Sequence, residues 1–294
     1  HRDLHSFPTR RSSDLLRQQP HWVLVYGGSQ SALVGALAAV RRHIPIAHAG
    51  AGLRSFNRRM PEEINRVLID AIAALLLVPH RTALDNLLRE GRPVERVCSV
   101  GDPLCDALQL HRLKAAQSNG VLADLGLTPK SFALATIHRA ENIDDPDRLR
   151  AIFEGLRGLS ALMRVIMPLH PRTFARLKQL PDLALKSLEA IHPVGYLDML
   201  RLESAAAVIV TDSISIPREA VLHGVPCVIP RDETESPDLV SSGWNRLVSP
   251  LKAGRIIETA QLARNAPGNP VTPCGDGHAA ERIAAALRAH YARQ

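Results

Sequence analysis

Short apolar runs alternate with longer amphipathic segments along the chain. Runs of four or five apolar residues have the length of buried strands, whereas segments with helical spacing are longer. The first part of the chain predicts a helix that begins at Pro61, because proline suits the first helical position. It also predicts strands at 22–26, 44–47, 75–78 and 96–100, and helices at about 31–42, 82–90 and 103–116.

A second series of the same kind begins near residue 131. Its predicted strands are 131–137, 164–168, 190–193, 206–210 and 226–229, and its predicted helices are 146–160, 171–180, 196–204 and 216–223. A terminal helix at 278–292 carries Ile283 and Leu287 at helical spacing. That spacing predicts one apolar face, which could pack back on the first domain.

Alternating strands and helices predict an α/β fold with parallel sheets covered on both faces. A polar stretch at 117–130, punctuated by Asn119, Gly120 and Pro129, indicates a domain boundary. We therefore expect two Rossmann-like doubly wound domains at 16–118 and 119–277, with 278–294 as the terminal helix. Ligands of such folds bind at the carboxyl ends of the strands.

Residues 1–15 are expected not to belong to the fold. The segment HSFPTRRSSDL back-translates onto a widely used sequencing adapter, and it lacks the apolar core of a signal peptide. The interpretation is an assembly artefact in place of the natural N-terminus, which leaves the first domain incomplete.

Composition narrows the function classes. The net charge of +7 favours an anionic partner, but aromatic residues make up only 3% of the chain and offer few platforms for stacking nucleic-acid bases. No apolar run reaches the roughly 18–20 residues of a membrane span. Cys98, Cys105, Cys227 and Cys274 form no CxxC pair, which argues against a zinc site and a disulfide framework and favours a cytoplasmic location.

The segment 48–66, HAGAGLRSFNRRMPEEINR, combines a Gly-Ala-Gly turn, several arginines and a Pro-Glu-Glu helix start. Glycine turns followed by arginines are typical of anion-handling loops. Glu62 and Glu63 fall in the first turn of the predicted helix, where carboxylates also stabilise the helix dipole. The local pattern is compatible with either role.

Histidines and arginines follow two neighbouring strands of the second series. His138 and Arg139 come directly after the strand at 131–137, and His170 and Arg172 follow the next strand. Since carboxyl ends of parallel strands meet at one edge, the pattern indicates an anion site there. The alternative for His138 is a residue that merely ends a strand.

Asp212 and Ser213 come between a strand and the helix at 216–223, which also carries Glu219. Backbone N–H groups at such a helix start can bind a diphosphate, although Asp212 or Ser213 could be a plain N-cap. A polar loop with Arg231, Thr234 and Glu235 follows the next strand. Motifs HExxH, GxSxG, GxxxxGK[ST] and GxGxxG are absent from the sequence, which disfavours metalloprotease, acyl-transfer, P-loop and nicotinamide chemistry.

Together these segments resemble the non-hydrolysing UDP-N-acetylglucosamine 2-epimerases. The resemblance rests on motifs spread from residue 22 to residue 288: GLRSFNRRMPEEINR, ATIHRAEN, PLHPRT, VTDS with Glu219, RDETESPD and GDGHAAERI. It implies two Rossmann-like domains in the GT-B arrangement, frequent dimerisation, and no NAD or obligatory metal. The implied reaction interconverts UDP-N-acetylglucosamine and UDP-N-acetylmannosamine through elimination and re-addition of UDP, with an acid and a base at C2.

The resemblance also assigns residues to the site. Glu62 and His138 are the predicted catalytic residues. The predicted UDP-binding residues are Arg54, His170, Arg172, Ser213, Glu219, Arg231, Thr234 and Glu235.

Five positions depart from the family pattern. Gly28 and Gly50 stand where the family has an aspartate and a glutamate, Ile214 and Ser215 replace a glycine pair, and Arg218 stands in place of an acid. Because glycine transfers no protons, the sequence leaves open an epimerase or a catalytically inactive UDP-sugar-binding homologue. A glycosyltransferase of the same architecture is a third reading.

Overall fold

The computed structural model describes residues 15, 17–117, 120–180, 183, 187–266, 268, 269, 271 and 275–291. They form two compact units that divide after Asp106, inside α5 (Pro103–Gln117), and the described residues from 275 onward belong to the first unit. The sequence placed the boundary at 118, near the end of this helix. Apart from Leu15, the segment interpreted as an artefact lies outside the described residues.

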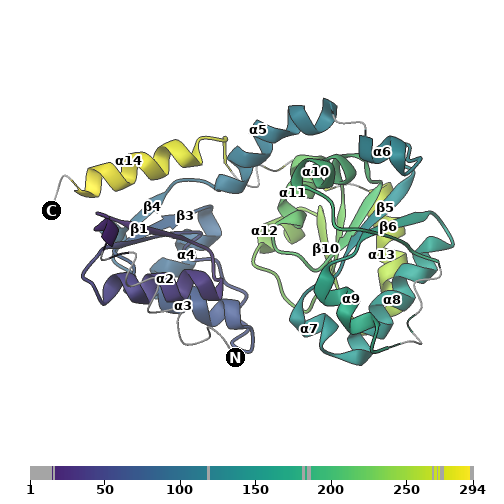
Figure 1. The fold of residues 1–294 in the computed structure, drawn as a ribbon, viewed down its shortest axis with the longest axis horizontal. Helices are drawn as coiled ribbons and strands as arrows, with labels where there is room; N and C mark the ends of the chain where they lie inside the picture. Colours follow the sequence, from purple (N-terminus) through teal and green to yellow (C-terminus); the bar gives the residue numbers. More distant parts are fainter. Residues whose placement is uncertain are drawn as a thin grey trace. The chain divides into compact units, whose positions relative to one another are not determined.

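The first unit holds a parallel sheet in the order β1-β2-β3-β4. The strands are β1 (Val23–Tyr26), β2 (Ile46–Ala49), β3 (Leu75–Val78) and β4 (Val97–Ser99). Parallel strands that follow one another across a sheet are joined by right-handed crossovers, which place their helices on one face. Accordingly, one face of the sheet packs on α2 (Gln30–Val40), α3 (Pro61–Ile72) and α4 (Arg81–Arg89) (Figure 1).

The opposite face of this sheet is covered by α14 (Ala279–Tyr291) (Figure 1). Ile283 of α14 is buried in one cluster with Ala49 and Leu77 of the sheet. The carboxylate of Asp106 accepts the backbone N–H groups of Ala279 (3.1 Å) and Ala280 (2.7 Å) at the start of the helix. A carboxylate there satisfies donors that the helix leaves without partners.

The second unit holds a six-stranded parallel sheet in the order β10-β9-β8-β5-β6-β7. Its strands are β5 (Phe132–Thr136), β6 (Arg164–Pro168), β7 (Glu189–Ile191), β8 (Val208–Thr211), β9 (Cys227–Pro230) and β10 (Asn245–Val248). Strand order reverses between β5 and β8. A reversal of this kind leaves a crevice at the carboxyl ends of the two strands, where ligands of open α/β sheets bind.

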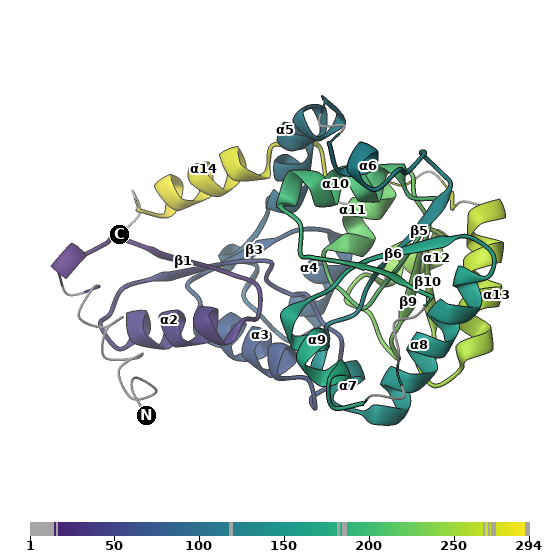
Figure 2. The same ribbon diagram turned by 45° about the vertical axis from the view of Figure 1, so that its right-hand side comes forward.

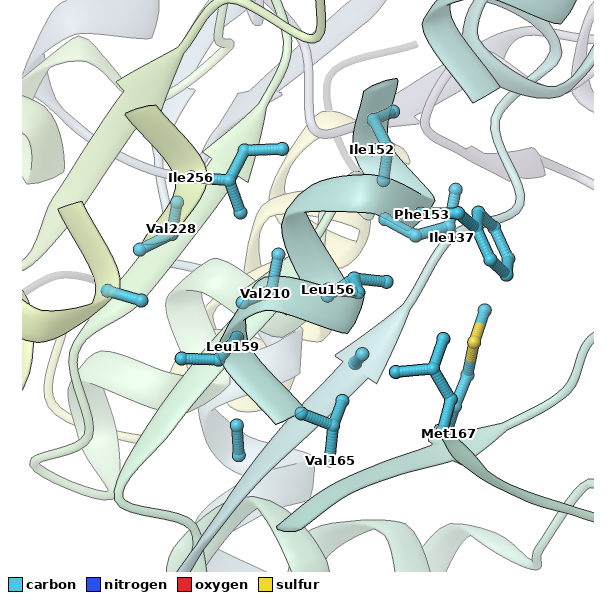
Figure 3. Packing of buried hydrophobic residues seen from close by; sticks show 14 of the residues in the cluster. Ile137, Ile152, Phe153, Leu156, Leu159, Val165, Met167, Val210, Val228 and Ile256 are labelled. Atoms are coloured by element: carbon cyan, nitrogen blue, oxygen red, sulfur yellow. The ribbon is translucent and has the colours of Figure 1, made fainter. Parts of the chain in front are cut away.

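Helices cover both faces of this sheet. Successive side chains of β5 point to opposite faces and all are buried, so both faces need a cover. Phe132 and Leu134 point to the face covered by α6 (Gly120–Asp124), α10 (Tyr196–Ala205) and α11 (Ile216–Leu222), whereas Ala133 and Ala135 point to the other. On that other face α8 (Pro146–Ser160) and α13 (Ala253–Asn265) pack side by side (Figure 2). Figure 3 shows this core, in which Leu156 of α8 lies beside Val210 of β8 and Phe153 of the same helix lies beside Ile137.

Side chains at the helix starts define several boundaries. Ser29 Oγ accepts the N–H of Ala32 (3.1 Å) and caps α2. Asp145 caps α8 by accepting the N–H of Asp147 (2.9 Å), with Pro146 at the first helical position. These local signals explain why the predicted helix 146–160 and the helix start at Pro61 coincide with α8 and α3.

Six of the described elements were missed by the sequence pattern, and one of them is the 3₁₀ helix η1 (Val94–Arg96). Three are short helices of four or five residues, namely α6, α7 (Ala140–Ile143) and α12 (Pro237–Ser241). The others are β10, which begins with two polar residues, and α13, whose buried Ile256, Ala260 and Ala263 have helical spacing that could have been recognised. No helix among the residues described is long and apolar enough to cross a bilayer.

Replacing Phe153 by alanine should destabilise the second unit by about 3–5 kcal/mol, because a fully buried ring leaves a cavity. The matched control is Leu162→Ala, at a side chain 52% exposed, which should cost less than about 1 kcal/mol. Urea unfolding followed by the fluorescence of Trp244, in a Trp22→Phe background, reports this unit. Equal costs for the two variants would contradict the packing shown in Figure 3.

Candidate functional site

A buried carboxylate joins the two strand ends at the switch point of the second sheet. Asp212 directly follows β8, and its side chain accepts the backbone N–H groups of His138 (3.0 Å) and Arg139 (3.0 Å) and the amide of Asn142 (3.1 Å). His138 and Arg139 form the turn after β5. Because one carboxylate takes three donors, this turn is held in one conformation against the end of β8.

Further hydrogen bonds bring neighbouring elements to the same edge. The hydroxyls of Thr136 and Thr211 lie 2.6 Å apart at the ends of β5 and β8. The Asn142 amide also donates to the carbonyl of Pro230 (3.0 Å) at the end of β9, and the Thr173 hydroxyl of α9 (Pro171–Leu177) donates to the carbonyl of Ile137. The carboxyl ends of β5, β8 and β9 therefore form one rigid rim.

Two histidine rings lie together on this rim. The ring centroids of His138 and His170 are 5.3 Å apart, with planes inclined by 30°. Burial lowers the pKa of His138 below its usual 6.5, although the nearby Asp212 acts in the opposite direction, and His170 lowers it further. A neutral imidazole beside a second one is suited to take up a proton when an anion arrives.

His170 and Arg172 also have structural contacts. The ring nitrogen Nδ1 of His170 accepts the N–H of Arg172 (3.2 Å) and caps α9. The Arg172 guanidinium donates to Asp144 (2.9 Å) at the surface, where about half of both side chains is exposed. Since exposed pairs contribute little, this arginine can exchange Asp144 for another anion at small cost.

Ser213 lies shortly before the start of α11, and Glu219 lies within this helix. Ser213 Oγ lies 3.3 Å from the backbone N–H of Ser215, just before the helix, so it acts as a local cap. Glu219 is 4% exposed, and its carboxylate accepts the hydroxyl of Tyr196 (3.2 Å) from the start of α10. The predicted phosphate ligand and the predicted ribose ligand thus both have defined positions.

The loop after β9 is held largely by its own residues. Arg231 makes a two-fold contact with Glu235 (2.9 and 3.2 Å), and both are nearly fully buried. Burial lowers the pKa of Arg231, but Glu235 and Glu141 outweigh it and raise the pKa overall. Thr234 Oγ1 accepts the N–H of Ser236 (3.2 Å), whose hydroxyl accepts from Arg218 (3.2 Å).

A largely apolar pocket of about 610 Å³ adjoins the histidine rim, between α9 and the end of β7. Its lining residues are Leu169, Pro171, Phe174, Ala190, Ile191, His192 and Pro193. Among the described residues, no group of three or more His, Cys, Asp or Glu side chains could hold a metal ion.

In the first unit, Asp70 of α3 is the centre of a buried polar network. Its carboxylate contacts His48 Nδ1 (2.6 Å) and Arg54 Nη2 (2.7 Å) and accepts the N–H of Gly52 (3.1 Å). Arg54 is 3% exposed and also donates to Glu90 (2.7 Å). Burial opposes ionisation of Asp70, but His48 and Arg54 outweigh it and lower its pKa. Arg54 therefore has a structural role in positioning the Gly-Ala-Gly turn.

The two glutamates of the Pro-Glu-Glu motif differ in their surroundings. Glu63 is 2% exposed; its carboxylate accepts the N–H groups of Ser55 (2.9 Å) and Phe56 (3.1 Å) and contacts Arg66 (2.6 Å). It holds Phe56 at a φ of +60°, which is uncommon for a bulky residue. Glu62, by contrast, is half-buried.

The backbone at Gly28 leaves no room for a side chain. A Cβ atom there would lie 2.4 Å from the carbonyl oxygen of Glu62 and 2.7 Å from Cγ of Arg66. The side-chain amide of Asn65 also joins α3 to this turn, because it donates a hydrogen bond to the carbonyl of Gly28 (2.8 Å). Gly50 has a φ of +86°, in the left-handed region that favours glycine. Close packing therefore favours glycine at position 28, and the backbone conformation favours glycine at position 50.

Comparison with known proteins decides the family. The sequence profile of the family described as UDP-N-acetylglucosamine 2-epimerase matches residues 10–288. The chain belongs to this family of isomerases. It is 44% identical over 252 residues to UDP-2,3-diacetamido-2,3-dideoxy-D-glucuronate 2-epimerase of Pseudomonas aeruginosa, covering 85% of this chain and 69% of that protein. It is 41% identical over 278 residues to UDP-N-acetylglucosamine 2-epimerase of Methanocaldococcus jannaschii, covering 92% and 75%.

Solved structures agree with this assignment. The M. jannaschii enzyme in complex with UDP-GlcNAc and UDP has a TM-score of 0.91 at 38% identity, covering 97% of this chain and 80% of that one. The Neisseria meningitidis enzyme bound to UDP-GlcNAc has a TM-score of 0.88 at 27% identity, covering 97% and 81%. The predicted α/β fold class, with two parallel sheets as in the GT-B-type epimerases, is confirmed.

The assignments of individual site residues stay predictions. The structure brings His138, His170 and Ser213 to one rim of the second unit, with Glu219 in the adjoining helix, whereas Glu62 and Arg54 lie in the first unit. Sequence reasoning missed the positioning roles of Asn142, Glu63 and Asp70. The available signal was a carboxylate inside the apolar run 67–73, where Asp70 stands.

Asp70→Asn should destabilise the first unit by about 3–5 kcal/mol at neutral pH, because it removes one of the two carboxylates that compensate the buried Arg54 charge. The pKa of Asp70 is lowered on folding, so its contribution is present above the unfolded value of 3.8 and is lost as the pH falls through the folded value. The difference in unfolding free energy should therefore shrink in acid. The control, Asp85→Asn at an exposed ion pair, should cost less than about 1 kcal/mol at any pH.

Gly28→Ala should destabilise the protein by about 1–3 kcal/mol, since the added methyl group meets backbone. Gly35→Ala, inside α2, is the matched control: its Cβ would lie 3.9 Å from Val25, so it should be neutral or stabilising. Urea unfolding of both variants measures the difference. Equal stability of the two variants would contradict the close approach of α3 to Gly28.

Proposed function

We propose that this chain binds a UDP-N-acetylhexosamine and interconverts UDP-N-acetylglucosamine and UDP-N-acetylmannosamine by epimerisation at C2. The observation that carries the proposal is the rim at the switch point of the second sheet, where two histidines, a serine hydroxyl and a buried glutamate adjoin. This location and these side chains suit a nucleoside diphosphate.

The proposed roles follow from the chemistry of each group. His138 and His170 donate hydrogen bonds to the diphosphate, Arg172 leaves Asp144 to pair with it, and Ser213 donates its hydroxyl. Glu219 accepts the ribose hydroxyls. Arg231, Thr234 and Glu235 complete the binding loop after β9. Fixed donors of this kind stabilise the departing UDP when the bond to the sugar breaks.

Proton transfer at C2 is assigned to Glu62, with His138 as the second catalytic residue. The reaction removes the C2 proton, expels UDP as an anion, returns a proton to C2 on either face and re-adds UDP. Neither NAD nor a metal ion is part of this proposal. We expect the reaction in the cytoplasm, because the scattered cysteines suit a reducing compartment, and a homodimer is the proposed assembly.

A catalytically inactive UDP-sugar-binding protein is the alternative, and Gly28 favours it. The carbonyl of Glu62 lies where a side chain at position 28 would begin, so an aspartate there needs a movement of α3. Reverting Gly28 alone is therefore expected to disturb the fold before it restores proton transfer.

Proton exchange at C2 in D₂O, followed by NMR, distinguishes the two functions. UDP-N-acetylglucosamine and UDP-2,3-diacetamido-2,3-dideoxy-D-glucuronate are the two substrates to compare. An active protein incorporates deuterium at C2 and forms the second epimer. Glu62→Gln should slow this exchange by roughly 10²–10⁴-fold, because it removes a general acid or base, while the control Glu95→Gln, at an exposed glutamate, should not.

Calorimetric titration with UDP tests the binding half of the proposal. Ser213→Ala should weaken UDP binding about tenfold through loss of a hydrogen bond to a charged group. UDP binding without deuterium exchange at C2 would establish a catalytically inactive UDP-sugar-binding protein. Absence of UDP binding would contradict both functions.

A further inference from the structure

Glu203 of α10 is a buried acid that the proposed function does not use. Its exposed fraction is 0%, and neither carboxyl oxygen has a hydrogen-bond partner among the described residues. Buried polar groups are almost always hydrogen-bonded, and a buried charge without a partner is costly. The side chain is therefore accommodated in its neutral, protonated form.

The position of Glu203 on the helix relates it to the nucleotide site. Tyr196 lies seven residues earlier on α10, two turns away on the same face, and its hydroxyl contacts Glu219 of α11. The helices α10 and α11 pack against each other. Glu203 and Glu219 thus share one buried interface, with Glu219 at the end that adjoins the rim.

Few other charges face Glu203. On β9, burial and then Glu203 itself raise the pKa of the Cys227 thiol, so this group is neutral. Lys130 lies near the end of α10, but its ammonium group donates to the carbonyls of Ser204 (3.2 Å) and Ala206 (3.0 Å). His223, at the end of α11, is kept neutral by burial, Lys130 and Arg112, which lower its pKa to about 4.

Two further groups near this interface have contacts of their own. Arg218, the neighbour of Glu219, donates to the hydroxyl of Ser236, and His111 of α5 contacts the edge of the Tyr196 ring. Burial, followed by the proximity of Glu219, raises the pKa of Glu203 well above 4.5. Ionisation of Glu203 at higher pH would place a second negative charge beside Glu219.

We propose that Glu203 is a positioning residue for Glu219. While Glu203 is protonated, Glu219 carries the only negative charge of the pair. Ionisation of Glu203 displaces Glu219 and weakens binding of a nucleoside diphosphate. The inference rests on the proposed function, in which Glu219 binds UDP. It makes UDP affinity sensitive to pH through a group that does not touch the ligand.

Calorimetric titration with UDP from pH 6 to pH 9 tests the inference, on wild type and Glu203→Gln. Glutamine keeps the shape of the protonated acid and cannot ionise. At pH 6 the two proteins should bind UDP equally. As the pH rises, the affinity of the wild type for UDP should become about tenfold weaker than that of the variant, a change that corresponds to roughly one pKa unit. Titration of His138 and of UDP itself affects both proteins alike and cancels in the ratio.

Glu258→Gln on α13 is the matched control, because it removes an exposed carboxylate and should follow the wild-type profile. Unfolding in urea without UDP provides a second readout. Since the pKa of Glu203 is raised on folding, the wild type should lose stability relative to Glu203→Gln as the pH rises above 4.5.

The outcomes separate the inference from the proposed function. A pH-dependent affinity ratio, present for Glu203→Gln and absent for Glu258→Gln, supports the positioning role. A ratio that stays constant while the wild type binds UDP overturns the inference and leaves the proposed nucleotide site intact. No UDP binding by the wild type at any of these pH values overturns the proposed function and the inference with it.

Discussion

The second unit depends on one buried carboxylate at the point where its strand order reverses. Asp212 takes backbone donors from the turn after β5 while it is itself fixed at the end of β8. Without it, the turn that carries His138 would have buried N–H groups with no partner, which is costly in a fold interior. The same carboxylate holds Asn142, which reaches the end of β9. These contacts pre-organise the rim, and pre-organisation lowers the cost of ordering a site when a ligand binds.

The first unit uses the same device at a different place. Asp70 and Glu63, both buried on α3, hold the segment 52–56 through backbone N–H groups and arginines. These contacts bring α3 close to the turn at Gly28, and that closeness excludes a side chain there. Position 28, where the sequence resemblance expects a carboxylate, is a packing contact in this chain.

Much of the fold could be predicted from the sequence, because local signals agreed with tertiary packing. Strands at 75–78 and 164–168 are continuous apolar runs, and α8 begins at an Asp-Pro cap. The misses have physical causes as well: β10 starts with Asn245 and Arg246, and its place in the sheet is decided by pairing with β9. The site was predicted as a set of strand-end residues, but local sequence does not report which of them form internal contacts, as Arg231 does with Glu235.

The sequence by itself determined the fold class, the family and the residue types at the strand ends, because periodicity and motif spacing are properties of the chain alone. Tertiary structure decided the rest. It showed that His138 and His170 lie against each other, that Arg54 is enclosed by Asp70 and Glu90, and that Gly28 touches α3. It also revealed Glu203 as a buried acid beside Glu219. Such facts depend on burial and on distances between residues far apart in sequence, which no local pattern contains.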